Sequence, residues 1–105
     1  MSLDIQSKHL KVVQSILKEH IPEYSVIAFG SRIHGTATAV SDLDLCIMSQ
    51  EPLSFLALAE LRDAFSLSMI PYRVDISVWS DLSPQFQEII KNKNVVIQEV
   101  GFRHD

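Results

Sequence analysis

Two short segments of this sequence alternate polar and aliphatic side chains, and they limit the folds that the chain can adopt. Residues 42–48 begin Asp-Leu-Asp-Leu and then become uniformly apolar, and residues 73–79 alternate again. Alternation with a period of two is typical of a β-strand that has one buried and one open face. We therefore expect two strands whose aliphatic faces cover the same layer of helices.

Helices and further strands are predicted around these two segments. An amphipathic helix is expected over 3–19, because its aliphatic residues recur at spacings of three, four and seven. A short apolar run at 25–29 ends at a glycine and is predicted to be a strand. Two more helices are expected after Ser54 and Ser83, where a hydroxyl can cap a helix start, and residues 95–98 are predicted to form an edge strand. The inward face of the last helix is assigned to Phe86, Ile89 and Ile90.

The size and composition of the chain indicate a small globular domain. Its 105 residues are assigned to one domain, 1–105, and the 47% hydrophobic content supplies enough apolar side chain for a core. Because helices and strands alternate, the expected architecture is a single α/β layer structure. Cys46 is the only cysteine, which excludes a disulfide framework and a cysteine-rich zinc site.

Charge and hydropathy argue against two classes of protein. Nine basic and thirteen acidic side chains give a net charge of −4, whereas a general nucleic-acid binder needs an excess of Lys and Arg. The longest apolar runs are only a few residues long, too short to span a membrane. No basic segment followed by an apolar stretch precedes the first helix, so we expect a cytoplasmic location.

Three aspartates are expected to lie together on the open face of the sheet. Asp42 and Asp44 share a face because they are two residues apart on one strand, and Asp75 lies on the corresponding face of the other. Carboxylates this close repel one another in a partly desolvated cleft, so a cation is needed among them. Oxygen ligands without His or Cys favour Mg²⁺ or Mn²⁺, usually held together with substrate phosphates. The trio therefore predicts a metal-bound phosphate compound.

The turn before these aspartates supplies the second half of the predicted site. Gly30 and Ser31 stand where the first strand is expected to pass into a single helical turn, with Ser31 as its N-cap. Unpaired backbone N–H groups at such a start can bind phosphate, and a glycine lets the phosphate approach the chain closely. We therefore expect the amides and the Ser31 hydroxyl to bind the outer phosphates, while metal ions bind the reacting one.

The spacing of these residues resembles a known family. Gly30-Ser31, then ten residues, then Asp42-Leu43-Asp44, with a further aspartate on a later strand, resembles the nucleotidyltransferase superfamily that includes DNA polymerase β. The segment 30–45, GSRIHGTATAVSDLDL, is most similar to its minimal members, the MNT domains. The resemblance implies a polymerase β-like nucleotidyltransferase fold of class α/β (α+β), with a small mixed sheet of three to four strands packed on one face by helices. It also implies an antitoxin that is encoded beside a HEPN-domain ribonuclease toxin and forms a complex with it, with a homodimer as the alternative when alone.

The same resemblance implies a reaction and a role for each site residue. AMP would pass from ATP, with Mg²⁺ as cofactor, to a tyrosine hydroxyl of the HEPN partner and so silence it. Asp42 and Asp44 would ligate both metal ions, and Asp75 would ligate the ion that activates the acceptor hydroxyl. The nucleotide-binding residues implied are Gly30, Ser31 and Arg32. Family members often carry an arginine where this chain has His34, so charge neutralisation on pyrophosphate would be weaker here.

Two other functions stay open at this point. The fold could be retained without catalysis, as a nucleotide-binding module that inhibits its partner by docking alone. The other open function is nucleotidyl transfer to a small molecule, although nucleotidyltransferases of that kind generally carry a further domain that holds the acceptor. Several remaining residues are not expected to take part in catalysis. Cys46 is expected to be buried in the core, and Tyr72 and Trp79 are expected to pack in the core or contact a partner. His9, His20 and His104 are expected to be solvated side chains.

Overall fold

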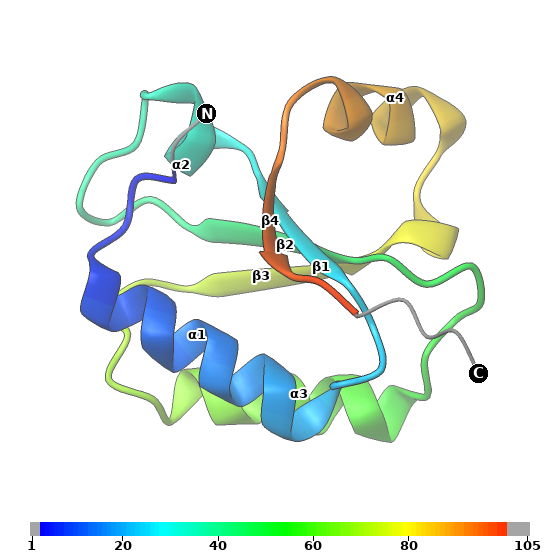
Figure 1. Cartoon of the computed structure of the whole chain (residues 1–105), viewed down its shortest axis with the longest axis horizontal. Helices are drawn as coiled ribbons and strands as arrows, with labels where there is room; N and C mark the ends of the chain where they lie inside the picture. The colour runs from blue at the N-terminus through cyan, green and yellow to red at the C-terminus, as the bar shows by residue number, and fades with distance from the viewer. Residues whose placement is uncertain (1–2, 101–105) are drawn as a thin grey trace.

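The structure, a computed structural model, describes residues 3–100 and contains every helix and strand that the sequence predicts (Figure 1). In chain order the elements are α1 (Ser7–His20), β1 (Val26–Phe29), α2 (Ser31–His34), β2 (Leu43–Ile47), α3 (Phe55–Ser66), β3 (Val74–Val78), a 3-10 turn (Trp79–Asp81), α4 (Pro84–Asn92) and β4 (Val95–Gln98). The first helix begins later than the predicted residue 3. Over residues 3–100, none of the helices is both long and apolar enough to cross a bilayer.

The four strands form one mixed sheet in the order β3-β2-β1-β4. β1 pairs antiparallel with both β2 and β4, whereas β2 and β3 are parallel. The register opposes Leu43 to Val74 and Asp44 to Asp75 across the parallel pair. The predicted mixed sheet is confirmed, with the short strand at 95–98 at one edge and β3 at the other.

One face of the sheet is covered by α1 and α3, which lie side by side beneath it in Figure 1. The aliphatic residues of β2 and β3 point into this layer, and Leu43 and Leu45 are completely buried there. Val13 and Leu17 of α1 and Leu61 of α3 are their helical counterparts and are equally buried. The alternation in the sequence therefore directed both strands to the same helical layer, as expected.

The last helix differs from the expectation that helices pack on one face only. α4 covers part of the opposite face, where Ile90 packs with Ile27, Cys46 and Trp79. Ile90 is buried, but Ile89 is 62% exposed, so assigning Ile89 to the inward face was wrong. Consecutive helical residues point about 100° apart, and only one stripe of this nine-residue helix reaches the sheet. The buried position of Cys46 is confirmed.

Candidate active site

The face opposite α1 and α3 carries two aspartates side by side. Asp44 on β2 is paired in register with Asp75 on β3. Their neighbours along each strand point to the other face, so both carboxylates emerge on the open side. Asp44 is half-buried near the middle of the sheet, whereas Asp75 is exposed on the edge strand. This pair is the centre of the candidate site.

Asp42, the third predicted carboxylate, lies just before β2 and is held by Arg73. The guanidinium of Arg73 donates to Asp42 Oδ2 from Nη2 at 2.8 Å and from Nε at 3.2 Å. Within residues 3–100, no three His, Cys, Asp or Glu side chains converge as a group that could hold a metal ion. The attraction of Asp42 to Arg73 accounts for its orientation. Arg73 was not among the predicted site residues. Strand alternation could have identified it, because Arg73 precedes Asp75 by two residues and therefore shares its face.

The electrostatics of Asp44 reflect this crowding. Burial is the main cause that raises the pKa of the Asp44 carboxyl above its ordinary value of 3.8, and the carboxylates of Asp75 and Asp42 raise it further. Arg73 opposes the shift only in part. The side chains around ionised Asp44 therefore supply too little positive charge to balance its negative charge. A cation bound beside Asp44 would relieve the repulsion between the carboxylates.

Gly30 lies directly against Asp44, at the end of β1. Its φ of 84° lies in the region that favours glycine, and a Cβ at this position would collide with Oδ2 of Asp44. The register explains the contact, because Phe29 is the partner of Asp44 across the antiparallel pair. Glycine therefore lets the carboxylate of Asp44 lie directly against the backbone of the turn. Gly30 is also the N-cap of α2, so the prediction that Ser31 is the cap was wrong by one residue.

Arg32 has partners different from those that the sequence analysis assigned. It is only 5% exposed, and its guanidinium donates to the carbonyl oxygens of Ser41 at 2.8 and 3.0 Å and of Asp4 at 3.0 Å. It also lies 3.8 Å from the ring centroid of Tyr72 and donates to the Thr38 carbonyl at 3.3 Å. Because its fork of donors is occupied by backbone carbonyls, Arg32 holds the segment that leads into Asp42.

His9 is buried, so its prediction as a solvated side chain was wrong. It is 6% exposed, and its Nδ1 lies 3.3 Å from the hydroxyl of Tyr72. The signal was present in the sequence, because His9, Val13 and Leu17 follow one another at intervals of four on one helical stripe. Tyr72, bonded to His9 and stacked on Arg32, has the packing role that was expected.

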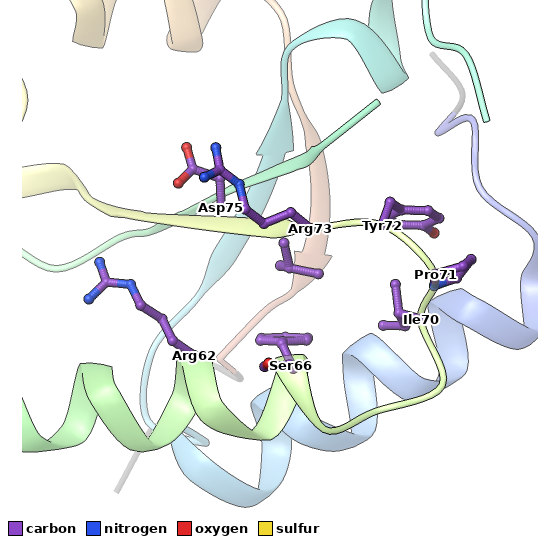
Figure 2. Close-up of a pocket in the computed structure, with 9 residues that line it drawn as sticks. Arg62, Ser66, Ile70, Pro71, Tyr72, Arg73 and Asp75 are labelled. Carbon is purple, nitrogen blue, oxygen red and sulfur yellow. The ribbon is translucent and has the colours of Figure 1, made fainter. Parts of the chain in front are cut away.

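Two cavities flank the aspartate pair. One, of about 510 Å³, runs beside β3 and is lined by Arg62, Arg73 and Asp75 among others (Figure 2). The other, of about 250 Å³, lies between the end of β1 and α4 and is lined by Gly30 and Phe86 among others. The site is therefore accessible from the β3 side and from the β1 side.

Comparisons with known proteins show the family of the chain. The family model described as "Polymerase beta, Nucleotidyltransferase" matches residues 11–100. A Haemophilus influenzae protein named "Probable protein adenylyltransferase MntA" is 53% identical over 97 residues, which cover 92% of this chain and 85% of that protein.

Two solved structures are similar in fold. A "Crystal structure of the toxin-antitoxin with AMP-PNP" matches with a TM-score of 0.71 at 21% identity, over 84% of this chain and 71% of that one. A mutant of the toxin-antitoxin MntA-HpeT matches with a TM-score of 0.68 at 23% identity, over 87% and 72%. At these identities the two structures show a shared fold alone. The family model, by contrast, covers most of the chain, and this protein therefore belongs to the polymerase β nucleotidyltransferase family of enzymes.

Proposed function

We propose that this enzyme transfers AMP from ATP to a tyrosine hydroxyl of a partner HEPN ribonuclease toxin, in a cytoplasmic complex with it, and so acts as its antitoxin. The observation that carries the proposal is the in-register pair of Asp44 and Asp75 with Gly30 against Asp44. The name of the Haemophilus influenzae relative supports adenylyl transfer to a protein. The descriptions of the two similar folds support a nucleotide and a toxin partner.

The donor set of the site suits a hard divalent cation. Carboxylate oxygens are the ligands that Mg²⁺ and Mn²⁺ prefer, and the raised pKa of Asp44 marks a point where positive charge is in deficit. Asp42, Asp44 and Asp75 would hold the metal, with Asp42 turning away from Arg73. Both partners of that ion pair are exposed, so water can replace it at little cost. When bound, Mg²⁺ would neutralise phosphate charge and acidify the acceptor hydroxyl.

The order of the strands suggests how the substrates are arranged. The Gly30 turn lies on the β1 side of Asp44, and Asp75 lies on the β3 side. In the proposal, Gly30 and Ser31 bind the outer phosphates, and the α-phosphate sits at Asp44. The acceptor hydroxyl approaches Asp75, its oxygen bonds to the α-phosphorus, pyrophosphate leaves, and Asp75 takes the proton. Arg32 acts by positioning the segment before Asp42.

Intact-mass spectrometry of a co-expressed HEPN partner tests this function. The partner is expected to gain the mass of AMP with the parent enzyme and to lose that gain with Asp42→Asn or Asp44→Asn. Asp63→Asn, an exposed carboxylate on α3, is the matched control and keeps the gain. Chelation of divalent ions should abolish transfer as well. An unmodified partner in the presence of ATP and Mg²⁺ would contradict the proposal.

One variant separates catalysis from inhibition by docking. If adenylylation silences the toxin, Asp75→Asn should abolish both the mass gain and the neutralisation of the ribonuclease. A pure docking module would still neutralise its partner with this substitution, since the change adds no bulk. Toxin activity measured on RNA with each variant therefore decides between the two functions.

A further inference from the structure

The cavity beside β3 is built differently from the rest of the site. Its lining includes the buried apolar side chains of Phe65, Ile70 and Val74, which we call its floor. The guanidinium groups of two arginines form its rim. Arg62 rises from α3 toward β3, and Arg73 lies just before β3, close to Asp75 (Figure 2). The groove therefore combines an apolar floor with exposed positive charge. It ends at the carboxylate of Asp75, which the proposed function makes catalytic.

Within residues 3–100, the strand that borders this groove is an edge strand of the sheet. β3 is the outermost strand on its side of the sheet, so alternate residues direct their N–H and C=O groups away from β2. Arg62 lies at this edge, because its Nη2 donates to the Ile76 carbonyl oxygen at 3.3 Å, and an incoming segment would take over that carbonyl when its carboxylate draws the guanidinium away. Such an edge can be paired by an extended polypeptide, whose main chain supplies matching donors and acceptors.

The two arginines differ in whether a carboxylate neutralises their charge. Arg73 is paired with Asp42. Arg62 is exposed, and within residues 3–100 no carboxylate lies at ion-pair distance from it. A cation kept on the rim of a groove, in a chain of net charge −4, is suited to a negatively charged group on an incoming molecule.

Given the proposed function, we propose that the acceptor is presented as an extended polypeptide segment with an acidic side chain beside its hydroxyl residue. The segment lies along the edge of β3, its apolar residues fill the floor of the groove, and its carboxylate pairs with Arg62. The acceptor hydroxyl then reaches Asp75. Arg62 is thus a specificity-determining residue for the protein acceptor.

Two other ligands fit these observations less well. RNA would use the arginines but leave the strand edge and the apolar floor without partners. The triphosphate of ATP would be drawn to the guanidinium groups, but the Gly30 turn lies on the opposite side of Asp44. The combination of floor, edge and rim therefore favours a polypeptide.

The test uses two short fluorescent peptides in an extended valine-rich sequence, each with one tyrosine flanked by glutamates or by lysines. Binding is measured by anisotropy without ATP or metal ions. The parent protein is expected to bind the acidic peptide about fivefold more tightly than the basic one. Arg62→Glu should reverse the preference, because it replaces an attraction by a repulsion. Arg62→Lys keeps the charge and should keep the preference.

Lys11→Glu is the matched control, since it makes the same change of charge at an exposed position of α1 and should leave the preference unchanged. Equal binding of the two peptides by the parent, or a preference that survives Arg62→Glu, would overturn the inference. So would displacement of the acidic peptide by metal-free ATP or by single-stranded RNA at equal concentration. AMP transfer to the HEPN partner is scored separately, so a failure of the proposed function remains distinguishable from a failure of this groove.

Discussion

The two faces of the central sheet come from the same strands but have opposite properties. On the face toward α1 and α3, Leu43 and Leu45 are fully buried. On the other face Asp44 lies between them in sequence, and burial together with the nearby carboxylate of Asp75 raises its pKa. Apolar burial stabilises the first face, and like-charge repulsion destabilises the second. The difference shows that the helical layer stabilises a sheet whose other face can remain open and charged.

The open face is itself divided. α4 covers the part that holds Ile27 and Cys46, and it leaves Asp44 and Asp75 uncovered. Cys46 follows Asp44 by two residues on the same face, so the boundary between sealed and open surface falls within one strand. The variants below test this contrast between sealed and charged surface, beginning with the largest effect.

Truncation of the sealed face should have the largest effect on stability. Leu45→Ala removes a fully buried side chain between α1, α3 and the sheet, and it should lower the free energy of unfolding by about 2–5 kcal/mol. Urea denaturation measures the change. Val96→Ala, at a 54% exposed position of β4, is the control and should change it by less than about 0.5 kcal/mol. Similar losses in the two variants would mean that the helical layer is not the main source of stability.

The segment that enters the open face should depend on a buried charge. Arg32→Met leaves the carbonyl oxygens of Asp4 and Ser41 without their donor, which should cost about 1–3 kcal/mol. Limited proteolysis should then cut faster within residues 36–42. Arg62→Met removes an exposed arginine and serves as the control. Unchanged stability and proteolysis in Arg32→Met would show that the loop is held by other contacts.

The sequence predicted the two faces well, because alternation is local information. The period of two placed Leu45 and Ile76 inside and Asp44 and Asp75 outside, and the structure has them there. Alternation cannot give the register, however, since a parallel pair can slide by two residues without changing faces. The direct opposition of Asp44 and Asp75 therefore required the structure.

Contacts between distant segments were the part that the sequence could not supply. Arg32 was assigned to the nucleotide because of the family resemblance, yet its guanidinium is buried against carbonyls of the N-terminal segment and of the loop after α2. Nothing in its own neighbourhood in the sequence identifies those partners. His9 and Arg73 differ, because helical spacing and strand parity marked both positions.

The charged face should become more stable when one charge is removed. The folded-state pKa of Asp44 is raised, so the stability due to its proton is complete below 3.8 and is lost as pH rises through the higher folded value. Asp44→Asn should therefore raise Tm at neutral pH, without metal ions, by on the order of a few degrees. The gain should shrink toward pH 3.8. Thermal unfolding across pH measures it.

Asp63→Asn, an exposed carboxylate on α3, is the control for this experiment and should show no such pH dependence. Added Mg²⁺ should stabilise the parent protein more than Asp44→Asn, because the metal compensates the charge that the variant lacks. A lower Tm for Asp44→Asn at neutral pH would show that the carboxylate is already compensated within the protein.

The smallest effect concerns the boundary between sealed and open surface, where Cys46 reports on α4. Burial raises the pKa of its thiol to about 11. At a pH three units lower, only about one molecule in a thousand would be the reactive thiolate. A thiol reagent should therefore modify the folded protein far more slowly than the urea-unfolded chain. Ile90→Ala, which thins the cover over Cys46, should speed modification without altering Asp44. Equal rates for folded and unfolded protein would mean that α4 does not protect Cys46 from solvent. The open face would then extend along the whole of β2.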